Sequence, residues 1–175
     1  MDFANKQDML SRPIAAARFS LFGSFQLLAP DGSEIIISNR RARAVAAMLC
    51  LAPDEPIDRD HLSRLLWPGR FEAQARASLR QCLLDLRKLL AAADCELLEV
   101  SRSRVSLNGG SVRSDLTDLE NALADGDWPQ ATTLLLAIGG KQILDQLHFG
   151  EDFETWLAER RQSIDQRLQT SVSDA

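Results

Sequence analysis

The stretch from Phe71 to Leu90, FEAQARASLRQCLLDLRKLL, decides the fold that we expect for this chain of 175 residues. Its apolar residues recur with a period of about 3.6 residues, at Leu79, Cys82, Leu83, Leu86, Leu89 and Leu90. The opposite side of such a helix carries Gln74, Ala77, Gln81 and Lys88, and a flanking stripe carries Arg76, Arg80 and Arg87. The pattern therefore predicts a helix of about five turns with one buried face and one face rich in Gln and Arg.

The segment before this helix predicts a small sheet and two shorter helices. Apolar residues alternate at Phe19, Leu21, Phe25 and Leu27 around a break at Gly23, which is typical of two strands. After the turn signal Asp31-Gly32, the β-branched run Glu34–Ile37 predicts a third strand of an N-terminal antiparallel sheet. One helix is expected to be capped by Ser38 and to end at Pro53, and the next to be capped by Asp58 and to end at Trp67–Gly69.

A β-hairpin with a basic tip is expected after the long helix. Two pairs of apolar residues, Leu98 with Val100 and Val105 with Leu107, alternate on either side of Ser101–Arg104. Sheet, three helices and hairpin is the element order of a winged helix-turn-helix, an α+β fold whose third helix enters the major groove of DNA.

This fold predicts which side chains contact DNA. The groove is about 12 Å wide and accepts one helix, whose Gln and Arg side chains pair with base edges while other cations neutralise phosphates. The base-reading candidates are Gln74, Arg80 and Gln81. The phosphate candidates are Arg76, Arg87, Lys88, Arg102 and Arg104, with a third contact at Arg40, Arg41 and Arg43. For the helix alone, the arginine stripe is better explained as a solvated face, and only its combination with the strands and the basic hairpin favours DNA contact. Leu84 is either an incidental surface leucine or a contact to a thymine methyl group.

Several motifs also resemble one family. In order along residues 18–107, Leu21–Phe25, Arg43–Pro53, Leu65–Pro68, Gln74–Gln81 and Leu86–Leu90 resemble the N-terminal DNA-binding domain of the Streptomyces antibiotic regulatory proteins. These are OmpR-type winged helices followed by a helical bacterial transcriptional activator domain. The resemblance implies a recognition helix within 71–90 and a wing tip at Arg102–Arg104. It also implies a transcriptional activator that binds direct repeats in promoter DNA as a dimer or larger assembly and recruits RNA polymerase.

The second half of the chain continues the resemblance in part. Helices are expected over Asp115–Leu123 and from Gly126–Trp128 onward, a spacing similar to a tetratricopeptide pair, and Phe153–Arg161 resembles the next helix of the activator domain. Because that domain is longer in the family, we expect a fragment or a shortened member. The expected organisation is a flexible arm over 1–17, a winged helix over 18–107 and a partial tetratricopeptide-like domain over 108–175. The short connection Asn108–Ser111 predicts that the two halves pack into one compact unit.

The charge is divided between these halves. The net charge is −5, yet residues 38–104 hold twelve Lys and Arg against nine Asp and Glu, a balance of +3. Residues 105–175 hold five against twelve, a balance of −7. This asymmetry favours a basic DNA-binding module joined to an acidic module that faces away from DNA.

Other classes of function lack support in the sequence. No segment is long and apolar enough for a membrane helix and the N-terminus is not a secretory signal, so a cytoplasmic location is expected. Cys50, Cys82 and Cys95 are expected to be reduced and buried, and His61 and His148 have no partners at metal-ligand spacing. We therefore expect no cofactor, no metal and no enzymatic activity. The remaining alternative to a transcription regulator is a winged helix that acts as a protein-protein interaction module of a larger signalling protein.

Overall fold

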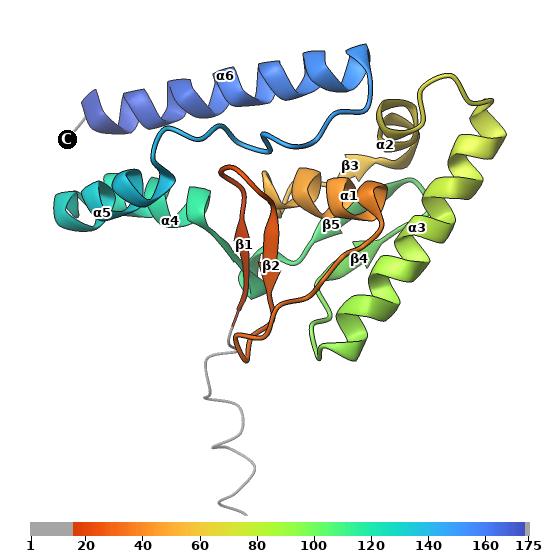
Figure 1. Ribbon diagram of the computed structural model, residues 1–175, viewed down its shortest axis with the longest axis horizontal. Helices are drawn as coiled ribbons and strands as arrows, with labels where there is room; N and C mark the ends of the chain where they lie inside the picture. Colours follow the sequence, from red (N-terminus) through yellow and green to blue (C-terminus); the bar gives the residue numbers. More distant parts are fainter. Residues whose placement is uncertain (1–15, 174–175) are drawn as a thin grey trace, which may run out of the picture.

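The computed structural model describes residues 16–173, so most of the arm predicted over 1–17 lies outside the described residues (Figure 1). The first half contains β1 (Ala17–Ser20), β2 (Gln26–Leu28), α1 (Arg40–Cys50), β3 (Ile57–Asp58), α2 (Arg59–Leu66), α3 (Glu72–Ala92), β4 (Leu98–Val100) and β5 (Arg104–Leu107). The second half contains a short 3-10 turn (Gly109–Ser111), β6 (Val112–Ser114), α4 (Asp115–Ala124), α5 (Trp128–Ile138) and α6 (Glu151–Ser173). Residues 16–173 therefore form a mixed α+β fold of two small sheets and six α-helices.

The N-terminal sheet has the order β2-β1-β6 and is only partly the one that the sequence predicted. β1 pairs antiparallel with β2, with Phe19 opposite Leu27, and parallel with β6. The predicted strand over Glu34–Ile37 is wrong, because Glu34 forms only a single bridge to Leu28 before the chain leaves for α1. β2 has only three residues, so it cannot form a longer hydrogen-bonded ladder with Glu34–Ile37. The other edge of β1 is occupied by β6.

The three helices of the first half have the predicted order. α1 is capped by Asn39, whose side chain accepts hydrogen bonds from the backbone of Arg41 and Ala42, so the prediction of Ser38 as its cap is wrong. Asp58 caps α2 as predicted, by accepting from the backbone N–H groups of the second and third helical residues. α3 buries most of the apolar face that the periodicity indicated, at Leu79, Cys82, Leu83, Leu86 and Leu90, whereas Leu89 is only half-buried; Ala75 is buried in addition.

The predicted hairpin β4-β5 is confirmed, and its sheet contains a third strand that was not predicted. Val100 lies opposite Val105 in β5, as the alternation required. β3, a strand of two residues before α2, pairs with the other side of β5 and extends this sheet to the order β3-β5-β4. The hairpin is thereby joined to the start of α2 through the backbone.

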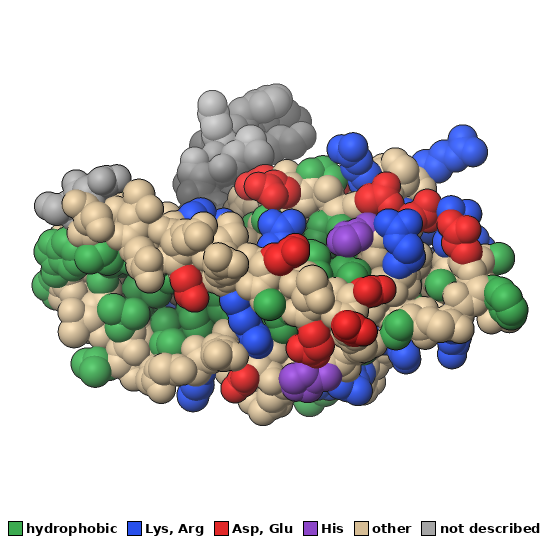
Figure 2. Space-filling view, turned by 90° about the horizontal axis from the view of Figure 1, so that it is seen from above, with side chains coloured by type: hydrophobic (Ala, Val, Ile, Leu, Met, Phe, Trp, Pro, Cys, Tyr) green, Lys and Arg blue, Asp and Glu red, His purple; other side chains and the backbone are tan. Residues whose placement is uncertain are grey.

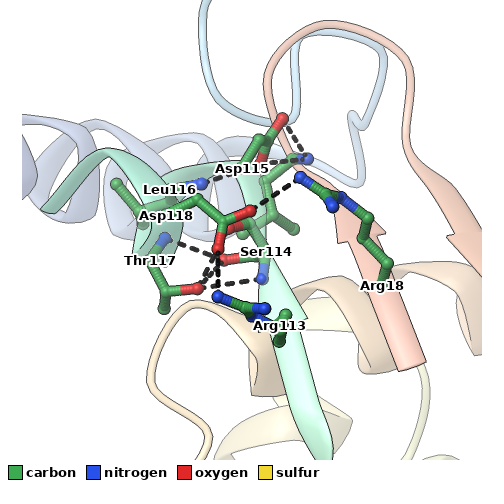
Figure 3. Close-up of polar contacts among 8 residues, drawn as sticks. Arg18, Arg113, Ser114, Asp115, Leu116, Thr117 and Asp118 are labelled. Atoms are coloured by element: carbon green, nitrogen blue, oxygen red, sulfur yellow. Dashed lines mark hydrogen bonds and ion pairs between the residues drawn. The ribbon is translucent and has the colours of Figure 1, made fainter. Parts of the chain in front are cut away.

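A polar junction connects the start of α4 to β1 and to the residues that follow β1 (Figure 3). Ser114 and Thr117 form a reciprocal capping box at the start of α4. The Asp115 carboxylate accepts hydrogen bonds of 2.9–3.1 Å from the backbone N–H groups of Leu21 and Phe22. Asp118 pairs with Arg18 of β1 at 2.7 Å. The predicted boundary between residues 107 and 108 stays a prediction, although the β1-β6 pairing crosses it.

The two halves share one hydrophobic core, which confirms the expected compact unit. α6 lies across the molecule, and its Phe153 and Leu157 are fully buried in the same cluster as Phe19 of β1 and Leu49 of α1 (Figure 1). A smaller cluster contains Leu119, Ala122, Leu123 and Ala131, against which Leu168 of α6 packs. Among residues 16–173, no helix has the length and apolar character needed to cross a bilayer.

Candidate nucleic-acid interface

The outward side of α3 presents the side chains that the sequence singled out. Helical periodicity sends Leu79 and Leu86 into the core, and the other side of the same turns is therefore left to solvent. The exposed residues include Gln74, Arg76, Arg80, Gln81, Arg87 and Lys88. Leu84 lies among them with 45% of its surface exposed. α3 thus presents polar and basic side chains to solvent from Gln74 to Lys88.

The wing tip is a tight turn that is fixed to the start of α2. The backbone N–H of Ser101 donates to the carbonyl of Arg104 at 2.9 Å, which closes the turn. Arg59 holds the turn from the side: its backbone N–H donates to the Ser103 carbonyl at 2.8 Å, and its guanidinium donates to the Ser101 carbonyl at 3.1 Å. The side chains of Arg102 and Arg104 project from this turn into solvent.

A groove of about 450 Å³ lies where α3, the start of α2 and the wing tip meet. Three of the predicted DNA contacts, Arg76, Arg80 and Arg102, line this groove. Arg59, which the sequence argument did not select, lines it as well, together with Asp58 and Asp60. The fold therefore brings part of α3 and the tip of the β4-β5 hairpin to one groove.

Arg76 already forms ion pairs with carboxylates of the same chain, at the protein surface. Its guanidinium donates to both carboxylate oxygens of Asp60 at 2.7 and 2.9 Å, and to Glu72 at 2.7 Å. The hydrogen bond and positive charge of Arg76 lower the pKa of the Asp60 carboxyl below its ordinary value. Arg76 thereby connects α3 to α2 in the free protein.

Five other cations on α3 and the wing have no such partner. Within residues 16–173, no hydrogen bond or ion pair is formed by the side chains of Arg80, Arg87, Lys88, Arg102 and Arg104. Positive side chains that the fold leaves free on one helix and its neighbouring hairpin are available to an external anion. Figure 2 shows charged side chains gathered over the end of the molecule that carries α2 and α3.

The three arginines at the start of α1 lie elsewhere and already have partners. Arg40 donates to the carbonyl of His148 at 2.7 Å and stacks over the ring of Phe149. The guanidinium of Arg41 donates to the carbonyl of Leu66, at the end of α2, and that of Arg43 to the carbonyl of Ile37. None of the three lines the groove at the wing tip. The structure therefore gives them contacts between elements, where the sequence predicted a third DNA contact.

Two residues near the predicted contacts escaped the sequence argument. Arg59 contacts the wing through pairings that are distant in sequence, so no local pattern indicates it. Asp85 accepts a hydrogen bond of 2.8 Å from the side-chain nitrogen of Gln81, one turn earlier on the exposed face of α3. The spacing of four residues between Gln and Asp is a signal that could have found this pair.

The described part of the chain contains neither a cluster of metal-ligating side chains nor an exposed cysteine. No group of three or more His, Cys, Asp or Glu side chains there could hold a metal ion. All three cysteines are free and buried. Burial raises the pKa of Cys82 to about 11, and it also raises the pKa values of Cys50 and Cys95.

No model of a known protein family matches the chain. The chain is similar to the transcriptional regulatory protein EmbR of Mycobacterium tuberculosis and of Mycobacterium bovis, with 36% identity over 75 residues. This match covers 43% of the chain and 19% of EmbR.

A solved structure, of Mycobacterium tuberculosis EmbR in complex with a low affinity phosphopeptide, has a similar fold. It superimposes with a TM-score of 0.56 and 26% sequence identity, over 90% of this chain and 42% of that one. The chain thus spans less than half the length of the relatives it matches. Over most of its own length, it is similar to one part of a transcriptional regulatory protein.

Proposed function

We propose that this chain is a sequence-specific DNA-binding module of a transcription regulator, and that it reads promoter DNA with α3 in the major groove. The observation that carries the proposal is the set of five cations that α3 and the wing tip present to solvent and that have no partner among residues 16–173. Similarity to a transcriptional regulatory protein supports it. No catalytic step, cofactor or metal enters the proposal.

The roles of the side chains follow from their positions. Gln74, Arg80 and Gln81 on the exposed face of α3 are assigned to base edges, because Arg and Gln pair in two-point fashion with guanine and adenine. Phosphate contacts are assigned to Arg87, Lys88, Arg102 and Arg104, with Arg59 added because it lines the same groove as Arg102. Arg76 is assigned to the contact between α2 and α3.

The acidic half is assigned to protein partners. In Figure 1, α4 and α5 lie at the end of the molecule away from α3, so the carboxylates of α4 are held away from the proposed DNA face. This arrangement supports a second protomer on direct repeats, or RNA polymerase, as the partner of that half.

One observation favours the second candidate, a protein-interaction module. α5 leaves three large apolar side chains exposed: Trp128 at 44%, Leu135 at 52% and Leu136 at 77%. An exposed apolar patch is typical of a surface that meets another protein. One chain can have both functions. Because only the first requires DNA, a measurement of DNA binding distinguishes between them.

The test compares two variants with the same change in charge. Binding of the full chain to duplexes from the region upstream of its own gene is measured by fluorescence anisotropy over a salt series. Arg102→Ala/Arg104→Ala removes two cations from the wing tip, whereas the control Arg113→Ala/Lys141→Ala removes two from β6 and the loop after α5. Since each lost phosphate contact reduces the slope of log K against log salt by about 0.9, the wing variant is expected to lose about 1.8 and the control close to zero. Absence of binding by the parent at low salt, or equal losses in both variants, would contradict the proposal.

A further inference from the structure

A carboxylate lies on the face of α3 that is proposed to meet DNA. Asp85 is exposed between Gln81 and Lys88, and a negative charge there opposes the approach of phosphates. Its side chain is engaged: Oδ1 accepts a hydrogen bond of 2.8 Å from Nε2 of Gln81, one helical turn earlier. The carboxylate therefore acts on a side chain that is itself assigned to base reading.

The hydrogen bond fixes which way the Gln81 amide faces. A glutamine amide has two N–H donors on one atom and an acceptor oxygen on the other. With Nε2 bonded to Asp85, a flip of the amide would place its oxygen against a carboxylate oxygen, which repels it and offers no proton. One N–H and the oxygen Oε1 of Gln81 consequently remain free, and the positions of this donor and this acceptor are fixed relative to Asp85.

One donor beside one acceptor matches adenine and mismatches guanine. In the major groove adenine presents the acceptor N7 beside the donor N6–H, whereas guanine presents two acceptors, N7 and O6. Building on the function proposed above, we propose that Asp85 is a positioning residue that orients Gln81 to read an adenine. An amide without this constraint can turn its nitrogen toward either purine.

The experiment is a selection of bound duplexes from a random-sequence library by the full chain and its variants. For the parent, the selected site is expected to contain an adenine column that Gln81→Ala abolishes. Asp85→Asn, which accepts or donates equally well, is expected to relax this column to adenine or guanine, and Asp85→Glu, which keeps the carboxylate, to retain adenine. Asp94→Asn is the matched control, since it removes the same charge from an exposed site just after α3, where Asn tolerates the left-handed backbone (φ 51°).

The size of the effect is measured on the selected site and on the same site with that adenine replaced by guanine. A two-point contact discriminates between bases by about ten- to a hundredfold, so the parent and Asp85→Glu are expected in that range and Asp85→Asn below about threefold. Total affinity is not the criterion, because Asp85→Asn and Asp94→Asn both remove a negative charge and both are expected to strengthen binding.

The outcomes separate this inference from the proposed function. If the parent selects no sequence, the function proposed above fails. If it selects a site but Asp85→Asn, folded by circular dichroism, keeps the adenine column intact, or Asp85→Glu relaxes it equally, Asp85 does not position Gln81.

Discussion

Arg80 and Arg87 are both exposed on α3 and both lack a partner within residues 16–173, yet we predict different roles for them. Arg80 lines the groove next to the wing tip and is assigned to a base edge, whereas Arg87 is assigned to a phosphate. Arg80→Ala is expected to cost about 1–3 kcal/mol on the selected site and to relax one base position, and Arg87→Ala to weaken all sequences alike. Titrations of selected and scrambled duplexes measure this. If both variants reduced binding to the two duplexes equally, α3 would not be the base-reading helix.

Leu84 tests whether the apolar part of the same face contacts a base. Its side chain is 45% exposed beside Gln81, which leaves it free to touch a thymine methyl group. If it does, the parent binds the thymine form of the site more tightly than the uracil form, and Leu84→Ala loses that preference. Competition between the two duplexes measures it. An equal loss on both forms would make Leu84 an incidental surface leucine.

The cysteines provide a residue-scale test of the core. Burial keeps the Cys82 thiol protonated near pH 8, because it raises its pKa to about 11, and Cys50 and Cys95 are buried and shifted upward too. We expect the folded protein to react with a thiol reagent only as fast as it unfolds, and all three thiols to react at once in denaturant. The absorbance of the coloured group that the reagent releases measures the reaction rate of both the folded and the denatured protein. Rapid reaction of one thiol in the native protein would place that cysteine at the surface.

At the scale of elements, the Arg76–Asp60 pair predicts coupling between α2 and α3. If Arg76 stays with Asp60 on DNA, Arg76→Ala leaves the salt slope of binding unchanged, and a double-mutant cycle with Asp60→Asn shows an interaction in stability. Because the pKa of Asp60 is lowered in the folded state, this stabilisation is present above its ordinary value of 3.8 and is lost as the pH falls through the lowered pKa. Denaturant unfolding at several pH values measures it. A salt slope reduced by about 0.9 in Arg76→Ala would instead show a phosphate contact.

Elements with a long periodic pattern were predictable from the sequence, and short strands were not. The face of α3 extends over five turns and the β4-β5 hairpin over two alternating pairs, so each has a strong local signal. β3 and β6 have two and three residues, and only their partners β5 and β1, distant in sequence, make them strands. Conversely, Glu34–Ile37 has a strand-like composition but lacks a neighbour with enough backbone to pair.

The same distinction applies to the interface. The cations of α3 and the wing tip were predictable because helix period and hairpin alternation determine exposure. The contacts of Arg41 and Arg43 were not, because their partners are backbone carbonyls of Leu66 and Ile37, which any residue could supply. A basic run at a helix start is therefore ambiguous from sequence: its arginines serve either an external anion or the carbonyl ends of neighbouring segments.

At the scale of the whole molecule, the second half completes the first. β6 supplies the third strand of the N-terminal sheet, and Leu144 of the loop before α6 donates its backbone N–H to the Leu21 carbonyl at 2.8 Å. Arg161 of α6 donates to the Ile143 carbonyl, which holds that loop in place. Removal of residues after Leu107 would therefore expose a core, so the coupling between the halves is better tested by single substitutions in the intact chain.

Phe153→Ala makes that test. The ring is fully buried in the shared core, packs at 5.1 Å between centroids against Phe149, and lies on α6, which contacts α2. Phe153→Ala is expected to reduce the free energy of unfolding by about 3–5 kcal/mol. Because the core is continuous, both halves are expected to lose stability. Hydrogen exchange followed by mass spectrometry should then show faster global exchange in peptides of α1 and α3 as well as α6. Leu136→Ala, which truncates a side chain that is 77% exposed on α5, is the control and should leave these rates unchanged. Faster exchange confined to α4–α6 would show that the first half unfolds independently, and the acidic half would then be a separate domain.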